Sequence, residues 1–451
     1  MSTALIILAA GMGSRMNSDT PKVLHQIAGA PMVVHAMKSG ETIAPDRTVV
    51  VAGHGAEAVE KAVKAWNPDA DIVLQAEQLG TGHAVQQAQA ALSDFEGEAI
   101  VLYGDTPFIR QETLKAMLEA RSNHDVVVLG FELNDPTARY GRLQMAGDDL
   151  LSIVEFKDAT EDQRAITLHN SGVVCADAAT LFSLLTEVKN ENAAGEYYLP
   201  DIVAIARAKG MSATAVTCPI EETLGVNTRA ELAAAEQFFQ NAMRAEALDN
   251  GVTLSEPSTV YFAHDTVIGR DTIIEPNVVF GPGVTIESGA TIRAFSHLEG
   301  CHVSRGGIIG PYARLRPGAE LAEDVRIGNF VEVKNAQLDE GAKVNHLSYI
   351  GDASIGKKTN VGAGTITCNY DGVFKHKTTI GQNAFIGSNT MLVAPVTVGN
   401  DAMTATGTVV TKNVPDGDMA VGRARQDNKT GFAVRLFEKL KAKKAKANKE
   451  A

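Results

Sequence analysis

The sequence has few cysteines and no long apolar run. Four of its 451 residues are cysteine, and Cys175, Cys218, Cys301 and Cys368 lie far apart, with no C-x-x-C pair. This spacing excludes a disulfide framework and a cysteine zinc site, so we expect buried thiols. No apolar stretch reaches the roughly 18 residues that a membrane-spanning helix needs, so we expect no integral membrane segment.

Positive charge is also scarce. The chain has 41 Lys and Arg against 54 Asp and Glu, a formal net charge of -13. We therefore expect no nucleic-acid partner, and an anionic small substrate would need local cations or a metal ion. The one basic run, KLKAKKAKANKEA from Lys439, is typical of a solvated, partly disordered tail.

The amino-terminal segment is apolar but lacks the basic region of a signal peptide. Residues 1–10 lead directly into a patterned loop and predict a first strand. We therefore expect a cytoplasmic protein.

The first half of the chain has the texture of an α/β domain. Within residues 1–228, apolar runs such as ALIILAA, RTVVVAG and EAIVLYGD alternate with helical patterns such as RQETLKAMLEA. This pattern predicts a mainly parallel, Rossmann-like mixed sheet with helices on both faces and ligand loops at the carboxyl ends of its strands. Residues 229–250 predict one linker helix, opened by a capping box of Thr228 and Glu231.

From residue 251 to 451 the apolar period becomes six, and many of the periodic positions are followed by glycine. This hexapeptide pattern predicts a parallel β-helix in which each short strand points one side chain inward. A break at 364–379 predicts a loop on one face. The positions in phase are Ile268, Ile274, Phe280, Ile286, Ile292 and Leu298; Leu315, Leu321, Ile327 and Val333; Val344 and Ile350; Ile355 and Val361; and Ile380, Ile386, Leu392 and Val398.

The stretch LAAGMGSRMNSDTPKVL, residues 8–24, follows the first apolar run. It lacks the third glycine of a dinucleotide fingerprint, where Met16 stands, and it lacks the G-K-[ST] of a P-loop. Backbone N–H groups at 10–13 with Arg15 and Lys22 suit a nucleoside triphosphate. A glycine turn with ordinary surface cations fits the same residues.

LAAGMGSRM and PKVL resemble the signature of sugar-phosphate nucleotidyltransferases, with Ser14 at a position where threonine is usual. The resemblance continues through QAEQLGTGHAV, VLYGDTP, YGRL, VEFKDA, LHNSGV and GVNTRAEL. With the β-helix it covers nearly the whole chain and points to the bifunctional N-acetylglucosamine-1-phosphate uridyltransferase and glucosamine-1-phosphate N-acetyltransferase family. It implies a uridyltransferase domain at 1–228, a left-handed β-helix acetyltransferase domain at 251–451, and a role in bacterial peptidoglycan and lipopolysaccharide precursor synthesis.

The resemblance also implies the residues of the uridyltransferase site. Asp105 ends an apolar strand, where an Mg²⁺ ligand is expected, and the resemblance pairs it with Asn227. By themselves, Asp105 also fits a capping or turn residue and Asn227 a turn residue before a helix. The implied nucleotide and sugar contacts are Leu8, Ala9, Ala10, Gly11, Arg15, Lys22, Gln75, Gly80, Thr81, Tyr103, Gly104, Asp105, Gly141, Glu155, Asn170 and Asn227.

For acetyl transfer the resemblance makes His346 the base. A histidine has a suitable pKa to take a proton from an attacking amine, although a lone histidine also fits a structural role. The family pattern has alanine where this chain has Thr406. The implied substrate contacts are Arg316, Lys334, Tyr349 and Asn360, and the implied acetyl-CoA contacts are Ala363, Asn369, Tyr370, Ser388, Thr406 and Arg423.

The sequence therefore predicts a bifunctional enzyme that makes UDP-N-acetylglucosamine. It would acetylate glucosamine 1-phosphate with acetyl-CoA as co-substrate, then transfer uridylyl from UTP with Mg²⁺. The resemblance implies a homotrimer. Two alternatives are a nucleotidyltransferase whose solenoid only assembles subunits or binds a regulator, and a nucleotide-sugar sensor. The combination of His346, Arg316 and Lys334 with the NYDG loop favours the two-site enzyme.

Overall fold

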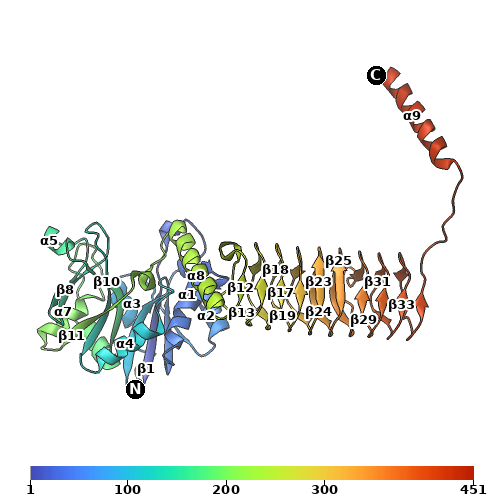
Figure 1. Cartoon of the computed structure of the whole chain (residues 1–451). Coiled ribbons are helices and arrows are strands. Elements are labelled where there is room, and N and C mark those ends of the chain that lie inside the picture. The colour runs from blue at the N-terminus through green and yellow to red at the C-terminus, as the bar shows by residue number, and fades with distance from the viewer. Residues whose placement is uncertain (1, 451) are drawn as a thin grey trace. The chain divides into compact units, whose positions relative to one another are not determined.

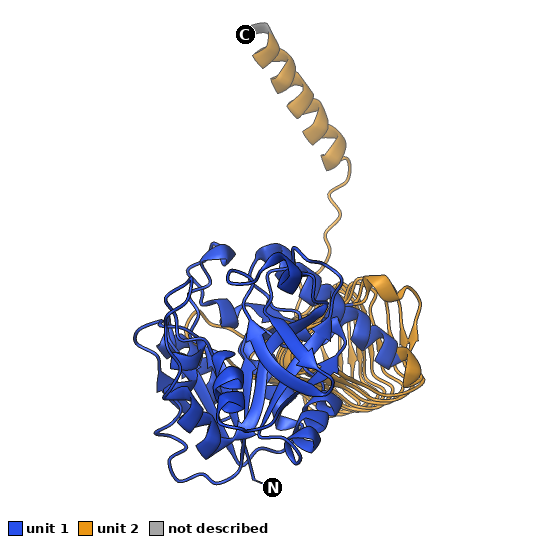
Figure 2. Cartoon of the chain, turned by 90° about the vertical axis from the view of Figure 1, so that its left-hand side faces the viewer, with its two compact units in different colours: residues 1–247, 261–266 blue, residues 248–260, 267–451 orange. Residues whose placement is uncertain are grey.

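The computed structural model describes residues 2–450 and divides into two compact units (Figure 2). One unit comprises Met1–Ala247 with Tyr261–Thr266, and the other comprises Leu248–Val260 with Val267–Ala451. No helix among the described residues is long and apolar enough to cross a membrane.

A mixed sheet forms the centre of the first unit (Figure 1). Its strand order is β11-β7-β10-β6-β1-β4-β5, with a β8-β9 ribbon beside β10. Neighbours are parallel except where β10 runs against β6, β7 and β8, and where β8 runs against β9. The bounds are β1 Thr3–Ala9, β4 Arg47–Ala52, β5 Asp71–Leu74, β6 Glu98–Tyr103, β7 Val126–Glu132, β8 Arg142–Ala146, β9 Asp149–Val154, β10 Leu168–Asp177 and β11 Ala213–Cys218; β2 Gln26–Ile27 and β3 Ala30–Pro31 form a separate pair.

Helices cover both faces of this sheet, as the alternation of apolar runs predicts. Alternate residues of β1 enter two cores: Ile6 packs with α3, α6 and α7, whereas Ile7 packs with α1, α2 and α4. The helices are α1 Met32–Glu41, α2 Ala56–Trp66, α3 Thr81–Gln86, α4 Gln111–Arg121, α5 Glu161–Arg164, α6 Ala178–Leu185, α7 Asp201–Ala208 and α8 Arg229–Asp249; short turns are η1 Ser14–Met16, η2 Lys22–Leu24, η3 Ile220–Thr223 and η4 Pro257–Thr259.

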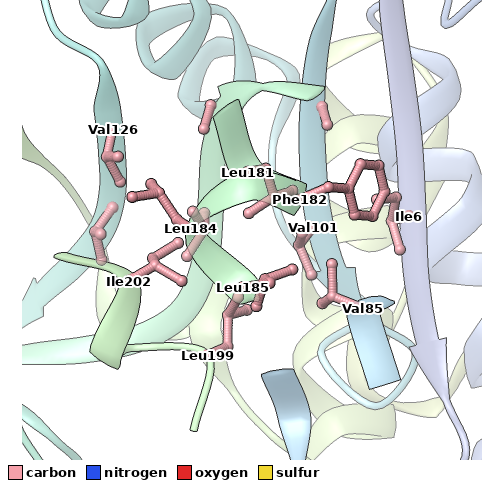
Figure 3. Packing of buried hydrophobic residues seen from close by; sticks show 14 of the residues in the cluster. Ile6, Val85, Val101, Val126, Leu181, Phe182, Leu184, Leu185, Leu199 and Ile202 are labelled. Carbon is pink, nitrogen blue, oxygen red and sulfur yellow. The ribbon is translucent and has the colours of Figure 1, made fainter. Parts of the chain in front are cut away.

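Figure 3 shows the first of these cores. Leu181, Phe182 and Leu185 of α6 lie against Val101 of β6, and all are at most 7% exposed. Burying side chains of this size stabilises the unit by about 1.5–3 kcal/mol each. The carboxyl ends of β1 and β6 are thereby held at one edge, where the loops after them form a site.

The helix predicted at 229–250 is α8, and its residues up to Ala247 belong to the first unit. Glu231 accepts hydrogen bonds from the backbone N–H groups of Asn227 (2.6 Å) and Thr228 (2.9 Å), and Thr228 Oγ1 accepts from Glu231 N (3.2 Å). The predicted capping box is therefore confirmed.

The second unit is a parallel solenoid of short strands (Figure 1). Three ladders run along it, and β24 and β26 cross a corner to join two of them. The first ladder is β12 Thr253–Leu254, β14 Ile273–Ile274, β17 Thr291–Ile292, β20 Ile308–Ile309, β23 Arg326–Asn329, β25 Lys343–His346, β27 Asn360–Val361, β30 Phe385–Ile386, β33 Met403–Thr404 and β35 Met419–Ala420. The other two contain β13 Val267–Ile268, β16 Thr285–Ile286, β19 Cys301–Val303, β22 Ala319–Leu321, β29 Thr378–Ile380 and β32 Val396–Val398, and β15 Val279–Phe280, β18 His297–Leu298, β21 Arg314–Leu315, β28 Ile366–Cys368, β31 Met391–Val393 and β34 Val409–Val410, joined by β24 Glu332–Leu338 and β26 Tyr349–Ile355.

The six-residue phase marks the interior of this solenoid. Every predicted inward position is buried except Ile268, which is partly exposed in β13 near the start of the unit. The break predicted at 364–379 is confirmed over a shorter range, because β28 and β29 extend into its two ends and 369–377 forms a loop with exposed Val373 and Phe374 at its tip.

Two expectations need correction. The tail from Lys439 belongs to the exposed helix α9, Phe432–Glu450, instead of a partly disordered end, because its Ala, Lys and Leu residues favour helix. Three cysteines are buried as predicted, but Cys368 is only partly buried. Burial raises the pKa of Cys175, Cys218 and Cys301 to about 12, so these thiols are protonated at neutral pH.

Candidate functional site

A cavity of about 320 Å³ lies at the carboxyl ends of β1 and β6. Nine of the residues that the resemblance implies line it, and so do four that the sequence analysis missed. The implied residues are Leu8, Ala10, Gly11, Lys22, Gln75, Gly80, Thr81, Tyr103 and Asp105, and the missed ones are Val23, Gln78, Ala84 and Glu196.

The glycine-rich loop packs closely against Lys22. Gly13 has φ +61°, and a Cβ there would lie 2.5 Å from Lys22 Cβ, so this position requires glycine. Gln78 Nε2 donates to Ala10 O at 2.7 Å and holds the loop from the other side. No sequence signal separated Gln78 from surface glutamines, because its partner is a backbone oxygen.

Lys22 joins the two predicted metal ligands. Its ammonium group pairs with Asp105 Oδ2 and donates to Asn227 Oδ1 at 3.1 Å. A carboxylate and an amide oxygen therefore converge on a cation, which is the hard donor chemistry that Mg²⁺ prefers. No cluster of three or more His, Cys, Asp or Glu able to hold a metal occurs in the described part of the chain. The residues fit Mg²⁺, which usually takes few protein ligands and completes its shell with phosphate and water.

Gln75, Gly80 and Thr81 form one end of the cavity. Gln75 is 5% exposed, and its Nε2 donates to Gly80 O at 3.1 Å. A Cβ on Gly80, where φ is +114°, would lie 2.6 Å from Tyr197 O. Thr81 Oγ1 accepts from Leu199 N at 3.0 Å. Hydrogen bonds and close packing therefore fix the positions of these three residues.

Gly141, Glu155 and Asn170 lie together but do not line the cavity. Asn170 N donates to Gly141 O at 2.9 Å, and a Cβ on Gly141 would lie 3.1 Å from Glu155 Oε1. Tyr103 lines the cavity and lies near these residues. Burial raises the pKa of its hydroxyl, and the charges of Glu155 and Asp105 raise it further.

The environment of the Glu155 carboxyl group disfavours its charged form. Burial, followed by the neighbouring charges of Asp201 and Asp158, raises its pKa. A ligand that donates hydrogen bonds to this carboxylate would relieve that cost.

Three implied residues have other positions. Ala9 is buried, and Gly104 N donates to Leu8 O at 2.9 Å, so these two shape the backbone behind the cavity. Arg15 in η1 is exposed and does not line it.

In the second unit, His346 ends β25 and is exposed. Asn329, at the matching position one coil earlier, places Oδ1 3.0 Å from His346 Nδ1. With Asn329 Oδ1 as the acceptor, a neutral imidazole carries its proton on Nδ1, and Nε2 is then able to accept one. Asn329 was not among the residues predicted from the sequence, although it lies 17 residues before His346, at the matching position of the preceding coil. A cavity of about 220 Å³ is lined by His346 and Asn329 with Arg293, Ile308, Gly310, Pro311, Arg326, Ile327, Gly328 and Asn345.

Across the corner after His346, Arg316 and Lys334 lie side by side. Arg316 N donates to Val333 O at 2.9 Å, so the register sets Arg316 beside Lys334 on adjacent coils. Arg316 pairs with Glu332 at 2.9 Å, a partner that the sequence analysis did not identify. Lys334 is partly exposed. Two adjacent cations suit a phosphate monoester.

Tyr349 and Asn369 also lie together. Asn369 Nδ2 is 3.5 Å from Tyr349 Oη and also donates to Asp352 Oδ2. Tyr370 is exposed, and Lys375 Nζ lies 4.3 Å from its ring centroid. Asn369 therefore holds one end of the NYDG loop in place, whereas the side chain of Tyr370 is exposed to solvent.

The remaining predicted acetyl-CoA residues follow one corner of the solenoid. Asn389 N donates to Ala363 O (2.7 Å), Gly407 N to Ser388 O (2.8 Å), and Arg423 Nη1 to Thr406 O. Gly364 N also donates to His346 O at 3.1 Å, so this row begins at His346. Asn360 lies in β27, beside Lys343. Tyr370 lies on the projecting loop.

A larger cavity, of about 410 Å³, lies under that loop and contains none of the predicted residues. Its lining is Gly318, Glu320, Asn335, Ala336, Gln337, Asp352, Ala353, Lys375, His376 and Lys377.

These two sites define a nucleotidyltransferase joined to a hexapeptide-repeat transferase. Residues 5–169 match the MobA-like NTP transferase domain, and residues 265–300 and 377–412 match the bacterial transferase hexapeptide (six repeats). The predicted fold class is therefore confirmed.

The full-length relatives are more specific. The chain is 67% identical to the bifunctional protein GlmU of Ruegeria sp. (strain TM1040), covering 99% of each chain, and 67% identical to that of Ruegeria pomeroyi, covering 100% of each. It is 64% identical to that of Cereibacter sphaeroides strain ATCC 17023, covering 100% of this chain and 99% of the relative. A solved UDP-glucose pyrophosphorylase complexed with UDP-glucose covers 54% of this chain at 17% identity, with a TM-score of 0.45, too low to carry an argument.

The chain belongs to the bifunctional GlmU family. It is a bifunctional enzyme, and the function predicted from the sequence is confirmed: acetyl transfer to glucosamine 1-phosphate and uridylyl transfer to N-acetylglucosamine 1-phosphate, which makes UDP-N-acetylglucosamine for the cell wall.

Proposed function

We propose that the two reactions take place at the two sites described above, with uridylyl transfer in the 320 Å³ cavity and acetyl transfer at His346. The observation that carries this assignment is the convergence of Asp105 and Asn227 on Lys22 in one unit, with a histidine oriented by Asn329 in the other.

In uridylyl transfer, a phosphate oxygen of N-acetylglucosamine 1-phosphate attacks the α-phosphorus of UTP. The new P–O bond forms as the bond to the β-phosphate oxygen breaks, and pyrophosphate leaves. The backbone of 10–13 and Lys22 bind phosphate oxygens, Gln75 and Gly80 contact the base, and Glu155 with Asn170 contacts sugar hydroxyls. Because the reaction needs no protein nucleophile, orientation and charge neutralisation dominate.

Asp105 and Asn227 would hold Mg²⁺. The ion supplies neutralisation of phosphate charge and orientation of the phosphates. Lys22, which contacts both of these residues, would bind a phosphate oxygen of the substrate beside the ion.

In acetyl transfer, the amine of glucosamine 1-phosphate attacks the thioester carbonyl of acetyl-CoA. The C–N bond forms, the C–S bond breaks and coenzyme A leaves, while His346 Nε2 takes the proton from the amine. Arg316 and Lys334 bind the sugar phosphate, Tyr349 and Asn360 bind the sugar, and the corner row from Ala363 to Arg423, with Asn369 and Tyr370, binds acetyl-CoA.

We also propose a cytoplasmic homotrimer. Acetyl-CoA and UTP are cytoplasmic substrates, and size measurement by light scattering tests the assembly. A monomer with full acetyltransferase activity would contradict the trimer.

The test of the two sites is a paired assay of thiol release from acetyl-CoA and pyrophosphate release from UTP. We expect His346→Ala to lose thiol release alone and Asp105→Ala to lose pyrophosphate release alone, each by at least about 100-fold. The matched control is His297→Ala, an exposed histidine of β18, which we expect to retain both signals. Wild-type pyrophosphate release without thiol release would favour the alternative in which the solenoid is only a scaffold.

A further inference from the structure

The amide of Gln75 has one orientation that the structure determines. Its Nε2 lies 3.1 Å from Gly80 O, which only accepts hydrogen bonds, so this atom is the NH₂ group. The second N–H of the same group faces His83 Nδ1, also at 3.1 Å. Both donors are therefore used inside the protein.

The acceptor of this amide has no protein partner. Gln75 lines the 320 Å³ cavity, and no hydrogen bond to its Oε1 is present among the described residues. The side chain is 5% exposed, so a ligand in the cavity is what this oxygen is placed to meet.

Only one protonation state of His83 fits this contact with Gln75. Because the group that faces Nδ1 is an NH₂ donor, Nδ1 is the acceptor of a neutral imidazole, and the ring proton is on Nε2. Gln87 Nε2 lies 3.2 Å from that nitrogen and also donates to His83 O at 3.0 Å, so Gln87 offers the ring no acceptor, and the proton on Nε2 of the partly exposed His83 meets solvent.

We propose that His83 is a positioning residue for nucleobase selection: it holds the Gln75 amide with Oε1 directed at the base and thereby favours uracil over cytosine. Uracil has an N–H donor at N3, which Oε1 accepts. Cytosine has a lone pair at N3, so two acceptors would face each other and repel. An amide turned by 180° would favour the opposite base. This inference rests on the proposed use of UTP in this cavity.

The test is the ratio of kcat/KM for UTP to kcat/KM for CTP, measured by pyrophosphate release. His83→Leu removes one of the two acceptors that hold the NH₂ group and leaves Gly80 O alone, so the amide turns more easily and we expect the ratio to fall about tenfold. His83→Asn places an amide oxygen near the position of Nδ1, and we expect it to keep the ratio within about twofold of wild type. His83→Ala removes the same acceptor with less bulk, so the result does not depend on one variant folding.

The matched control is Gln87→Ala, which removes the other neighbour of the ring and should leave the ratio unchanged. If His83→Leu and His83→Ala lowered kcat/KM equally for UTP and CTP, the role of His83 would be purely structural and the proposal would be overturned. A folded His83→Asn variant that did not retain the ratio would also overturn it. If the wild-type enzyme released no pyrophosphate from UTP, the proposed function itself would fail, which the wild-type arm reports separately.

Discussion

Gly13 shows how one residue without a side chain sets the position of the Lys22 cation. Its φ of +61° and the 2.5 Å approach that a Cβ would make to Lys22 combine two separate requirements for glycine. Gly147 has the same backbone conformation, φ +63°, but has no atom within 4 Å of the position of a Cβ. Comparing the same substitution at Gly13 and at Gly147 therefore distinguishes the effect of backbone strain from the effect of the contact with Lys22.

We expect Gly13→Ala to lower kcat/KM for pyrophosphate release at least tenfold, because the methyl group displaces Lys22 from Asp105 and Asn227. Gly147→Ala carries the same strain, about 1–2 kcal/mol, and should lower stability without changing kcat/KM. Steady-state kinetics and thermal unfolding measure the two effects. An equal loss of activity in both variants would contradict this account of Gly13.

Asn329 is the corresponding residue at the second site. We expect Asn329→Ala to lower kcat for thiol release about tenfold, because His346 loses the acceptor that assigns its proton to Nδ1. Asn329→Asp keeps an acceptor and should retain more activity than the alanine variant. Pyrophosphate release is the internal control, and an unchanged thiol kcat in Asn329→Ala would remove Asn329 from the site.

At the scale of elements, α1 contains a buried histidine with a measurable consequence. His35 is 5% exposed; its Nε2–H donates to Ile27 O at 2.8 Å, and its ring meets Phe239 of α8 edge-on at 5.6 Å. Burial, followed by the charges of Lys38 and His264, lowers its pKa from 6.5 to about 4, although the Ile27 bond opposes this shift.

The lowered pKa makes the first unit less stable in acid. Below pH 6.5 the unfolded chain takes up a proton that the folded chain refuses until about pH 4, so stability present above pH 6.5 is lost as the pH falls through this window. The loss is on the order of 3 kcal/mol. Fluorescence of Trp66, the one tryptophan, reports unfolding of this unit.

We expect His35→Gln to flatten that pH dependence, because glutamine keeps an N–H donor but does not titrate. The control is His54→Gln at an exposed position, which should unfold with the wild-type pH profile. Parallel profiles for His35→Gln and wild type between pH 4 and 6.5 would refute the assignment.

At the scale of the whole molecule, the two activities should respond independently to metal. We expect chelation by EDTA to abolish pyrophosphate release and to leave thiol release within about twofold, because Asp105 and Asn227 belong to the first unit and His346 to the second. Added MgCl₂ should restore the lost activity. Loss of thiol release on chelation would show that the second site also depends on a metal.

The sequence by itself determined the two kinds of architecture. An inward side chain every six residues specifies a solenoid because each coil repeats one pattern of burial, and continuous apolar runs between helical stretches specify a sheet covered on both faces. The glycine loop with Lys22, and Asp105 at the end of another apolar run, could be predicted as site residues because each lies in a local sequence motif.

Only the tertiary structure decided which side chains meet. Lys22 reaches Asp105 across 83 residues and Asn227 across 205, and Gln75 is held by His83 as well as by Gly80. Asn329 becomes the partner of His346 through the register between coils, and Arg15 stays outside the cavity although it belongs to the motif. Such pairs depend on the path of the intervening chain and on exact side-chain direction, which local patterns of apolar and polar residues do not specify.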